Sequence, residues 1–416
     1  MKKMNLSILA LFTLVILLSS CGFPGTVSTS AQLPLVSSTP TTVSLPPIRF
    51  PQDEAAHRDL TEWWYYTGHM DAVMPGGKLH HYGFELVFFQ ALRSDLPPFY
   101  AAHFAISDIT RGEFHFDQRR QIEAGAVIPN GTSTSGIAVH TGDWSIKGVN
   151  GLDHLAASMT DYTLHIDLHG LKPPTLHNGN GIITDKLGDF SYYYSRTRMA
   201  LSGILIDHNQ ALQVTGEAWM DHQWGNFLTL GGAGWDWFSI QLNDTTEMML
   251  YLIRDATGRT TSAYIDYIGP QSYVLPASAL KVTVLDHWRS PVTGTNYPSG
   301  WRVEINDPQL RASLTLVPEL KDQELVVYQS TGNSYWEGAV SIQGQSAGRS
   351  VEGEGYVELT GYARADKASN LIKTSACGDP YFRSIGRSRR SSRGAGERAA
   401  CSLLREGILV AVTSLH

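Results

Sequence analysis

Cysteine is scarce in this chain. Of its 416 residues only three are Cys, at positions 21, 377 and 401, and none lies in the stretch from 22 to 376. Disulfide bonds and Cys-ligated metal sites are therefore excluded from that stretch. Charged residues are also few, at 17% of the chain against the usual quarter. The net charge is −7. Without a basic patch in the body of the chain, nucleic acid is not an expected partner.

Several catalytic signatures are absent as well. The sequence has no G-x-S-x-G, which carries the nucleophilic serine of α/β-hydrolases, and no H-E-x-x-H zinc motif. No glycine-rich loop has the strand–loop–helix context that cradles phosphates. His165 and His169 would share a strand face, yet positions four apart in a strand are about 14 Å apart, which favours surface histidines over metal ligands. We expect neither a cofactor nor a bound metal.

The N-terminal apolar run, Ile8 to Leu18, is too short to cross a bilayer, which takes about 20 residues. It follows two lysines and leads into LSSCG at 18–22, which resembles a bacterial lipobox. Residues 1–20 would then be a signal peptide, and a lipid on Cys21 would anchor the protein to a membrane. An ordinary secretory signal is the alternative. The Ser-, Thr- and Pro-rich residues 21–49 indicate a flexible tether, so we expect an extracytoplasmic lipoprotein, in the periplasm, at the outer membrane or on the cell surface.

The body of the chain is patterned for β-strands. The run DYTLHIDLHG at 161–170 alternates apolar and polar side chains as a half-buried strand does, and turn signals such as PNG at 129–131 separate such runs. No long segment has helical periodicity, and short strands at this spacing predict an all-β barrel or sandwich. The glycine-rich LGGAGWDW at 230–237 divides two such regions. We therefore predict an N-terminal domain at 50–230 and a C-terminal domain at 231–364.

The last fifty residues differ in composition from the rest. Residues 365–416 contain the Arg-rich segment SIGRSRRSSRGAGER and both late cysteines. Three interpretations stay open: a disordered tail, a basic arm for anionic surfaces, or a C-terminus that a frameshift has replaced.

The run LTEWWYYTGHM combines many aromatic residues with few polar ones. In a strand, Glu62, Trp64 and Tyr66 line one face, while Trp63 and Tyr65 line the other. Whichever face meets the interior carries wide aromatic surface and one polar group, which is typical of an apolar ligand pocket. A β-core rich in aromatic residues, with Glu62 ion-paired, is the alternative.

Two polar side chains fall among apolar neighbours. Glu85 lies on an otherwise apolar face of the strand HYGFELVFF, where a carboxyl group without a partner has a raised pKa. A protonated Glu85 would be a general acid, but we favour an ion pair with Arg196 or Arg198. His103, in AAHFAISD, is flanked by apolar residues, and such a histidine is more often a core residue than a catalyst.

The segment TGEAWMDHQWG has the densest group of chemically active side chains. Strand alternation puts Glu217, Trp219 and Asp221 on one face and His222 on the other. Because the chain must turn where the strand ends, Asp221, His222 and Trp224 are expected to converge. A carboxylate beside an imidazole sets its tautomer and raises its basicity, and an indole supplies a flat apolar wall. An Asp-capped turn with an exposed His is the alternative.

Taken together, EWWYYTGHM, SYYYSRTRMALSG, VTGEAWMDHQWG, GWDWFSIQL and YVELTGYA resemble a lipocalin-like family that contains AttH proteins, bacterial carotenoid 1,2-hydratases and fungal kievitone hydratase. The resemblance runs from about Phe50 to Ala363. It implies two consecutive lipocalin-like antiparallel β-barrels with an aromatic cavity at or near their junction. It also implies cofactor-independent addition of water to an alkene of a hydrophobic substrate, or the reverse elimination.

The resemblance further implies that a His-x-Trp pair takes part in catalysis, which His222 and Trp224 match, with a Tyr and an Asp for which Tyr251 and Asp255 are loose matches. Aromatic faces would stabilise the carbocation that forms when an acid protonates the alkene. The predicted catalytic residues are His222, Asp221, Trp224, Glu62 and Tyr251. The predicted substrate-binding residues are Trp63, Trp64, Tyr66, Glu85, His103, Tyr193, Arg198, Trp219 and Trp235.

We therefore expect a secreted lipoprotein that binds a hydrophobic small molecule, such as a terpenoid or a lipid, and acts on it as an acid–base hydratase (a hydro-lyase). A non-catalytic carrier of apolar ligands is the alternative, because it needs the same aromatic barrel without a converging acid and base. A hydrolase ranks third, since the sequence has no recognisable nucleophile or metal motif.

Overall fold

The computed structural model describes residues 45–93, 96–122, 135–184, 190–227 and 234–363. Contacts divide the chain into a unit that ends at Pro46 and a second unit that begins at Pro47, to which nearly all of the described residues belong. Cys21, the tether up to residue 44 and the Arg-rich tail lie outside the described residues. Within the described ranges, no helix is both long enough and apolar enough to cross a membrane.

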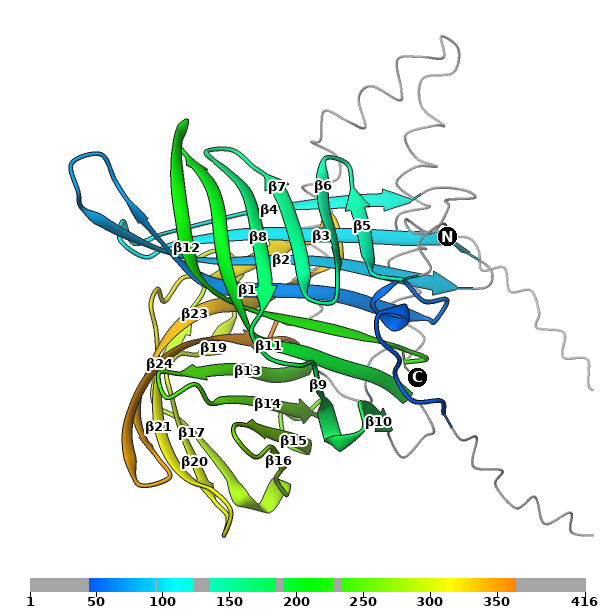
Figure 1. The fold of residues 1–416 in the computed structure, drawn as a ribbon, viewed down its shortest axis with the longest axis vertical. Helices are drawn as coiled ribbons and strands as arrows, with labels where there is room; N and C mark the ends of the chain where they lie inside the picture. Colours follow the sequence, from blue (N-terminus) through cyan, green and yellow to red (C-terminus); the bar gives the residue numbers. More distant parts are fainter. Residues whose placement is uncertain (1–44, 94–95, 123–134, 185–189, 228–233, 364–416) are drawn as a thin grey trace, which may run out of the picture. The chain divides into compact units, whose positions relative to one another are not determined.

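The second unit contains two large antiparallel sheets (Figure 1). The first sheet has the order β4-β3-β2-β1-β12-β11-β8-β7-β6-β5, and β9 and β10 pair with β11. Its strands are β1 (Thr61–Val73), β2 (Leu79–Arg93), β3 (Leu96–Asp108), β4 (Glu113–Ile122), β5 (Ile137–Thr141), β6 (Trp144–Val149), β7 (Leu152–Ser158), β8 (Tyr162–Gly170), β9 (Thr175–Leu176), β10 (Ile182–Thr184), β11 (Phe190–Asp207) and β12 (Gln210–Gly225).

The second sheet has the order β16-β15-β14-β13-β24-β23-β21-β20-β17, and β22 pairs with β23. Its strands are β13 (Gly234–Leu242), β14 (Glu247–Arg254), β15 (Thr260–Ile268), β16 (Tyr273–Val274), β17 (Leu280–Val284), β20 (Trp301–Asn306), β21 (Arg311–Pro318), β22 (Glu324–Val327), β23 (Asn333–Ser346) and β24 (Arg349–Leu359). The short strands β18 (His287–Arg289) and β19 (Asn296–Pro298) form a separate hairpin. The helices of the described ranges are the 3-10 turns η1 (Gln52–Glu54), η2 (His177–Gly179) and η3 (Ala277–Ala279). The predicted all-β, lipocalin-like fold class is confirmed.

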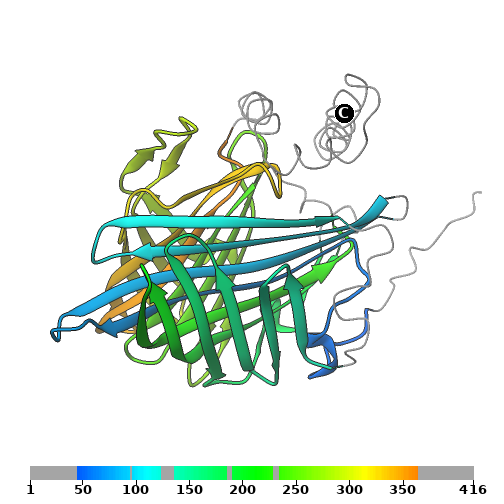
Figure 2. The same ribbon diagram turned by 90° about the horizontal axis from the view of Figure 1, so that it is seen from above.

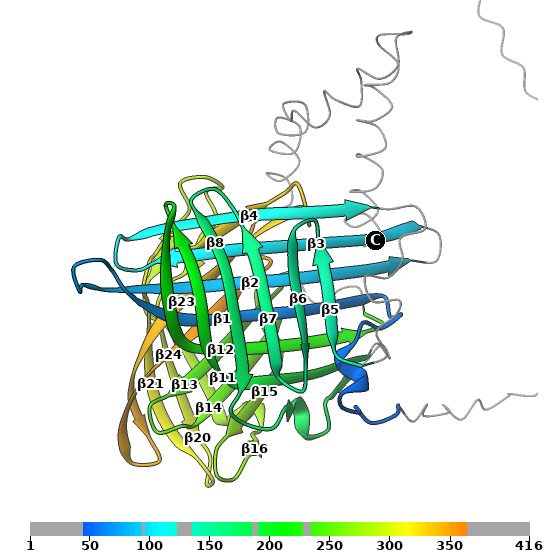
Figure 3. The ribbon, with the colours of Figure 1, turned by 45° about the horizontal axis from the view of Figure 1, so that its top comes forward.

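The first sheet curls so that β5 to β8 cross over β1 to β4 (Figures 1 and 3). Its core lies between these two walls, where the ring of Phe104 on β3 meets the ring of Trp144 on β6 edge-on at 5.8 Å. The long strands β11 and β12 belong to both walls, and β11 has a register shift between Arg196 and Met199. A shift of this kind bends a strand, which lets β11 pass from one wall to the other.

Strands differ in how many of their faces are buried. In β8, Leu164, Ile166 and Leu168 are buried while His165 and Asp167 are exposed, because its outer face meets solvent. In β1, β2 and the last half of β12 both faces are buried, because the second sheet covers the outer face. Figure 2 shows the second sheet, in green, yellow and orange, packed behind these strands.

The two sheets approach each other closely at Gly83 of β2. A Cβ atom at this position would lie 2.4 Å from the hydroxyl oxygen of Tyr356 and 2.9 Å from the Cβ atom of Ala339. Polar contacts also join the sheets, since the Tyr65 hydroxyl donates a hydrogen bond of 2.6 Å to Glu337. The first sheet ends at Gly225 and the second begins at Gly234. The domain boundary predicted at 230 falls outside the described residues and stays a prediction.

Candidate functional site: a cavity between the two sheets

A cavity of about 200 Å³ lies between the first sheet and the second, and its walls are mainly aromatic. The first sheet contributes Trp63, Tyr65 and Phe89, and the second contributes Trp235, Trp237 and Tyr251. The rings of Trp63 and Trp235 face each other with centroids 6.3 Å apart and planes within 14° of parallel. Flat aromatic walls with few polar groups suit an apolar ligand.

Strand register explains why these first-sheet side chains meet. Trp63 of β1 lies opposite Phe89 of β2, and Tyr65 lies opposite Val87. On the other side of β1, Tyr65 lies opposite Asp221 of β12. Because opposed residues of neighbouring strands point to the same side of a sheet, one face of three adjacent strands collects them all.

Glu85 of β2 lines this cavity, and one of its carboxyl oxygens is buried without a hydrogen-bond partner among the described residues. The Tyr335 hydroxyl donates a hydrogen bond of 2.8 Å to Oε1 of Glu85, while Oε2 has no hydrogen-bond partner among the described residues. Burial raises the pKa of Glu85 to about 8, the nearby Glu358 adds to the rise, and the Tyr335 hydrogen bond offsets part of it. Glu85 is therefore largely protonated at neutral pH.

The ion pair favoured for Glu85 is wrong, because both arginines have other partners. Arg196 lies 2.5 Å from Glu54, and Arg198 lies 2.6 Å from Glu247. In the sequence, Glu54 is 142 residues from Arg196 and Glu247 is 49 residues from Arg198. The tertiary fold, and not local spacing, therefore brings each pair together. Glu85 consequently corresponds to the alternative interpretation, a buried acid.

Two further buried carboxyl groups accompany Glu85. The Trp235 indole N–H donates a hydrogen bond of 2.7 Å to Glu358, and burial raises the pKa of Glu358 to about 7. Burial, together with Glu85 and Glu358, also raises the pKa of Glu337 well above its ordinary value. Like charges in a low-dielectric site cannot all ionise, so this group holds protons near neutral pH.

Asp221 lines the same cavity in a more polar setting. Its carboxyl group accepts hydrogen bonds from the hydroxyls of Tyr193 and Ser195 and from the indole N–H of Trp219, the last at 2.6 Å. Ser195 also lies 2.5 Å from Nε2 of His177. Burial raises the pKa of Asp221, and His177 together with these hydrogen bonds offsets part of the rise. Three donors aimed at one carboxyl group stabilise its charged form.

Glu85 and Asp221 are each backed by a buried histidine. Behind Glu85, the Tyr335 hydroxyl lies 2.7 Å from Nδ1 of His103, whose Nε2 lies 2.9 Å from the Ser330 hydroxyl. Burial lowers the pKa of His103 to about 3, so its ring is neutral. His103 thus lies behind Tyr335, which itself lines the cavity.

Behind Asp221, the chain of contacts runs through Ser195 to His177, whose Nδ1 lies 3.0 Å from Asp266. His177 belongs to η2 and Asp266 to β15 of the second sheet. Hydrogen bonds of this kind connect Asp221 to groups of both sheets, which holds its carboxyl group in one orientation.

The expected convergence of Asp221 with His222 is wrong. β12 does not end before Trp224 but continues to Gly225, and Trp224 is paired with Glu62 on one side and with Tyr192 on the other. Strand alternation therefore persists through the whole segment. Asp221 faces the cavity, and His222 faces the core that the curled first sheet encloses.

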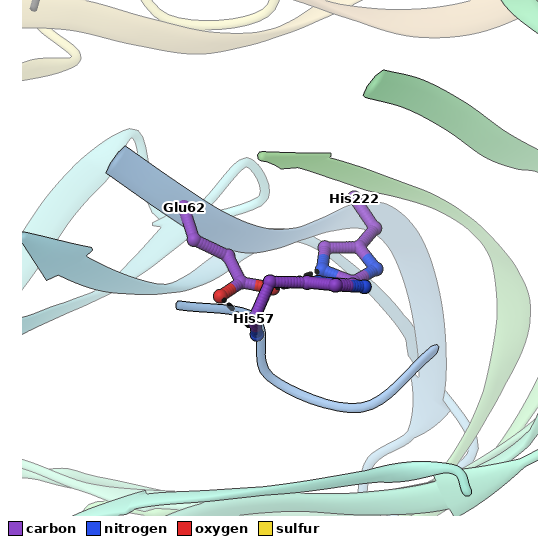
Figure 4. A group of neighbouring side chains, drawn as sticks. All are labelled: His57, Glu62 and His222. Atoms are coloured by element: carbon purple, nitrogen blue, oxygen red, sulfur yellow. Dashed lines mark hydrogen bonds and ion pairs between the residues drawn. The ribbon is translucent and has the colours of Figure 1, made fainter. Parts of the chain in front are cut away.

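On that opposite face, His222 contacts Glu62 and the rings of Trp64, Tyr194 and Trp224. Nε2 of His222 lies 2.8 Å from Oε1 of Glu62 (Figure 4). The Trp64 ring stacks on the His222 ring at 4.8 Å, and the Trp224 ring lies 4.6 Å from it. Burial lowers the pKa of His222 to about 4.

His57, in the coil before β1, completes this second group. Its Nδ1 lies 2.8 Å from the same Oε1 of Glu62, and its ring stacks on Trp224 at 4.1 Å with nearly parallel planes. Oε2 of Glu62 accepts hydrogen bonds from the His57 backbone N–H and from Gln90. Burial opposes ionisation of Glu62, but its hydrogen bonds with His222 and His57 outweigh burial and lower its pKa.

Comparison with known families places this site in context. The family model described as AttH-like matches residues 41–362. This chain belongs to the AttH-like family. The crystal structure of an AttH protein from Nitrosomonas europaea is similar to it, with 31% sequence identity, a TM-score of 0.68, and coverage of 77% of this chain and 99% of that one. Kievitone hydratase from Nectria haematococca has a similar fold, with 18% identity, a TM-score of 0.60, and coverage of 76% and 94%. No curated protein matches the chain.

In this AttH-like protein the residues predicted for the site divide between the two faces of β1 and β12. The predicted residues that line the cavity are Trp63, Glu85, Tyr193, Asp221, Trp235 and Tyr251. Trp219 donates to Asp221, and the hydroxyl of Tyr251 has no hydrogen-bond partner among the described residues. These placements are compatible with the predicted roles, which stay predictions.

The other predicted residues lie away from the cavity. Glu62, Trp64, His222 and Trp224 form the opposite group, and the Tyr66 hydroxyl donates a hydrogen bond of 2.9 Å to Asp153. Arg198 is engaged with the buried Glu247 and with the partly exposed Glu217. Asp255 lies in the turn between β14 and β15, where it pairs with Arg259.

Sequence reasoning missed several residues of the AttH-like site. They are His57, His177, Trp237, Tyr335, Glu337 and Glu358. Glu358 had a local signal, because it stands as the polar residue of the otherwise apolar run YVELT. His57 had none, since it lies in coil, where no periodicity predicts which way a side chain points.

Proposed function

We propose that this AttH-like protein binds a hydrophobic alkene of isoprenoid or lipid character between its two sheets and hydrates it by acid–base catalysis. The observation that carries the proposal is Glu85, a buried carboxyl group with a pKa raised to about 8, which lines an aromatic cavity and has one oxygen without a hydrogen-bond partner among the described residues. A general acid must be protonated at working pH and must reach its substrate directly. Glu85 meets the first requirement and lines the cavity, and its unpaired Oε2, which is buried, must turn toward the ligand to meet the second.

The reaction can be written with all its atoms. Glu85 gives its proton to one alkene carbon, which leaves a carboxylate on the protein and a carbocation on the other carbon. The oxygen of a water molecule bonds to that cation, and the proton it loses passes to a carboxylate of the cavity. Alkene and water thereby become an alcohol, and the protein holds as many protons as before. The cycle closes when the proton taken from the water is passed back to Glu85. The facing rings of Trp63 and Trp235 favour the step by stabilising positive charge between them.

Asp221 is the carboxylate that we assign to the water. Three hydrogen-bond donors surround it, whereas Glu85 has one. Two carboxyl groups in one site with such different surroundings take different roles, the poorly solvated one as the acid and the hydrogen-bonded one as the base. The chain from Asp221 through Ser195 to His177 lets the proton be shared after it leaves the water.

The size of the cavity narrows the ligand class. About 200 Å³ is less than the roughly 300 Å³ at which ligand pockets usually begin, so the cavity suits the end of a longer molecule. A branched alkene terminus of one or two isoprene units fits this description. The fold likeness to kievitone hydratase, a protein named as a hydratase, supports the same reaction class.

His222 and Trp224 take a supporting part in this proposal. They lie on the inner face of β12, so they hold the strand whose outer face carries Asp221. An alternative function, the carriage of an apolar ligand without chemistry, would use the same aromatic walls but no protonated Glu85.

An isotope experiment distinguishes these functions. The protein is incubated with a panel of prenylated phenols and linear terpenes in water enriched in ¹⁸O, and the products are analysed by mass spectrometry. The proposal expects an alcohol that carries ¹⁸O, formed by the wild type and lost in Glu85→Gln while ligand binding persists. Glu304→Gln, a change in an exposed ion pair of the second sheet, is the matched control. Ligand binding without ¹⁸O incorporation favours the carrier, and the absence of both rules out both functions.

We also propose that a lipid on Cys21 anchors the protein to a membrane outside the cytoplasm. The support is the lipobox-like LSSCG and the tether-like composition that follows it. Cys21→Ser should move the protein from the membrane fraction to the soluble fraction. If the variant stays with the membrane as the wild type does, the anchor proposal is wrong.

A further inference from the structure

Three ligand-type side chains converge on one point inside the first sheet, on the opposite face of β12 from the cavity. Nδ1 of His57 and Nε2 of His222 each lie 2.8 Å from Oε1 of Glu62 (Figure 4). The three potential ligand atoms all lie within 4.8 Å of one another. They come from three separate segments, the coil before β1, β1 itself and β12.

Two of the three ligand–ligand distances are close to those of a metal site, and the third, between the two ring nitrogens, is at most 4.8 Å and would have to shorten. Two ligands held about 2.1 Å from one ion are about 3.4 Å apart in a tetrahedron. The two contacts of 2.8 Å would therefore open by about half an ångström around an ion. His57 allows this movement, because it lies in coil and its side chain is 19% exposed, whereas Glu62 and His222 are fixed in strands.

Glu62 and His222 have hydrogen-bonded outer partners of the kind that orient metal ligands, and His57 lies near a carboxylate. Nε2 of His57 lies 3.8 Å from the Asp53 carboxylate, and Nδ1 of His222 lies 3.3 Å from the Tyr194 hydroxyl. Oε2 of Glu62 is held by Gln90 and by the His57 backbone. Metal-bound histidines usually engage an oxygen partner with the second ring nitrogen, and bound carboxylates are themselves hydrogen-bonded.

We propose that His57, Glu62 and His222 bind a divalent first-row transition-metal ion, with Zn²⁺ as the natural probe. Two imidazoles and one carboxylate form a donor set that zinc sites use with a fourth position left open. The partial exposure of His57 marks the side from which an ion enters. This site is separate from the Glu85 cavity, so the proposal does not depend on the proposed hydratase activity.

The test uses the full chain, stripped of metal with a chelator, dialysed and then loaded with Zn²⁺ or Co²⁺. Bound metal is counted by plasma mass spectrometry, and the Co²⁺ form is examined by visible absorption. We expect one ion per chain, the visible bands of tetrahedral or five-coordinate Co²⁺ without a thiolate charge-transfer band, and a rise of Tm with added Zn²⁺. Loss of metal in His57→Ala, which changes a partly exposed coil residue, is the decisive result.

A variant with an expected partial loss of Zn²⁺ affinity and a control variant distinguish loss of the metal site from misfolding. Asp53→Asn should weaken Zn²⁺ binding by at most about 10-fold, the lower end for an outer partner, because its carboxylate lies 3.8 Å from His57. The control is His81→Ala, because His81 also contacts a carboxylate, Asp71, but in an exposed pair. Three results would overturn the proposal: no retained metal in the wild type, which would leave a hydrogen-bonded triad only; a thiolate spectrum, which would assign the metal to cysteines; or equal Zn²⁺ binding in wild type and His57→Ala.

Discussion

Asp221 and His222 are neighbours in the chain but face opposite sides of β12. Asp221 accepts a hydrogen bond from Trp219 at the edge of the aromatic cavity, and His222 contacts Glu62 inside the first sheet. One strand therefore carries two separate groups of chemically active side chains, divided by the alternation of its residues. The proposed acid–base role of one face and the proposed metal binding of the other can therefore be tested independently.

The first prediction concerns this separation. Asp221→Asn keeps the size of the side chain but removes the charge that three donors surround, so turnover should fall by about 10²- to 10⁴-fold, the usual contribution of a general base. Zn²⁺ binding should persist, because Asp221 does not face His222. Turnover assays and metal counts on the same preparation measure both quantities. Joint loss in a folded variant would show that the two faces are coupled.

The second prediction concerns the pH dependence of turnover. Glu85 acts as an acid only while protonated, and its pKa is raised to about 8, so kcat/KM should fall as the pH rises through about 8. The groups that face Glu85 are Tyr335 and the carboxyl groups of Glu337 and Glu358. A pH–rate profile of the wild type checks the position of this limb. A profile that stays flat from pH 6 to about 10 would exclude a carboxylic acid as the proton donor.

Protein stability should respond to the same group. Because the folded state raises the pKa of Glu85 from 4.5 to about 8, folded protein holds a proton that unfolded protein has lost between these values. Stability is therefore lost as the pH rises from about 4.5 to about 8 and then levels off. Glu85→Gln avoids this loss, so its advantage over wild type should grow by roughly 2–5 kcal/mol between pH 5 and pH 9 in urea unfolding. A pH-independent difference would contradict the buried-acid assignment.

Arg198 should prove to be structural. Its guanidinium group lies 2.6 Å from the buried carboxylate of Glu247 and also donates to the Leu242 carbonyl, away from the cavity. Arg198→Met removes one of the two cations that contact Glu247, and because Lys172 stays 2.6 Å from that carboxylate, it should cost about 1.5–3 kcal/mol in free energy of unfolding. Ligand affinity of the folded variant should be unchanged in a fluorescence titration. The control is Arg259→Met, which breaks an exposed pair and should cost less than about 1 kcal/mol.

The sequence predicts the fold better than it predicts the site, and β8 and β2 show why. In β8 one face meets solvent, so the alternation of apolar Leu164 and polar His165 predicts both the strand and which of its faces is buried. In β2 both faces are buried, and nothing local indicates that Phe84 faces the core of the first sheet while Glu85 faces a second sheet. Because the second sheet covers the outer face of β2, apolar residues occupy both faces of this strand, and the alternation of apolar and polar residues that predicts orientation is lost.

Long-range contacts account for the incorrect expectations at the site. Tyr335, the hydrogen-bond partner of Glu85, is 250 residues away in the chain, so no spacing could select it over the nearer arginines. For Asp221 and His222 the predicted alternation agrees with the structure, and the error lies in the predicted end of β12. The pairing of Trp224 with both neighbouring strands, which fixes that end, is again a property of the sheet rather than of the segment.

The close approach of the two sheets supplies the last prediction. At Gly83 an added Cβ atom would lie 2.4 Å from the Tyr356 hydroxyl oxygen and 2.9 Å from Ala339, so the sheets must move apart to admit even a methyl group. Gly83→Ala should therefore lower the free energy of unfolding by about 1–3 kcal/mol, as overpacking does. The control is Gly170→Ala, where the nearest atom to the new Cβ lies at 3.6 Å, an ordinary contact. Because Gly83 is two residues from Glu85, ligand affinity should fall together with stability in Gly83→Ala and stay unchanged in Gly170→Ala. Equal effects of the two substitutions would show that the sheets can yield at this point, and that the cavity between them does not depend on their close packing.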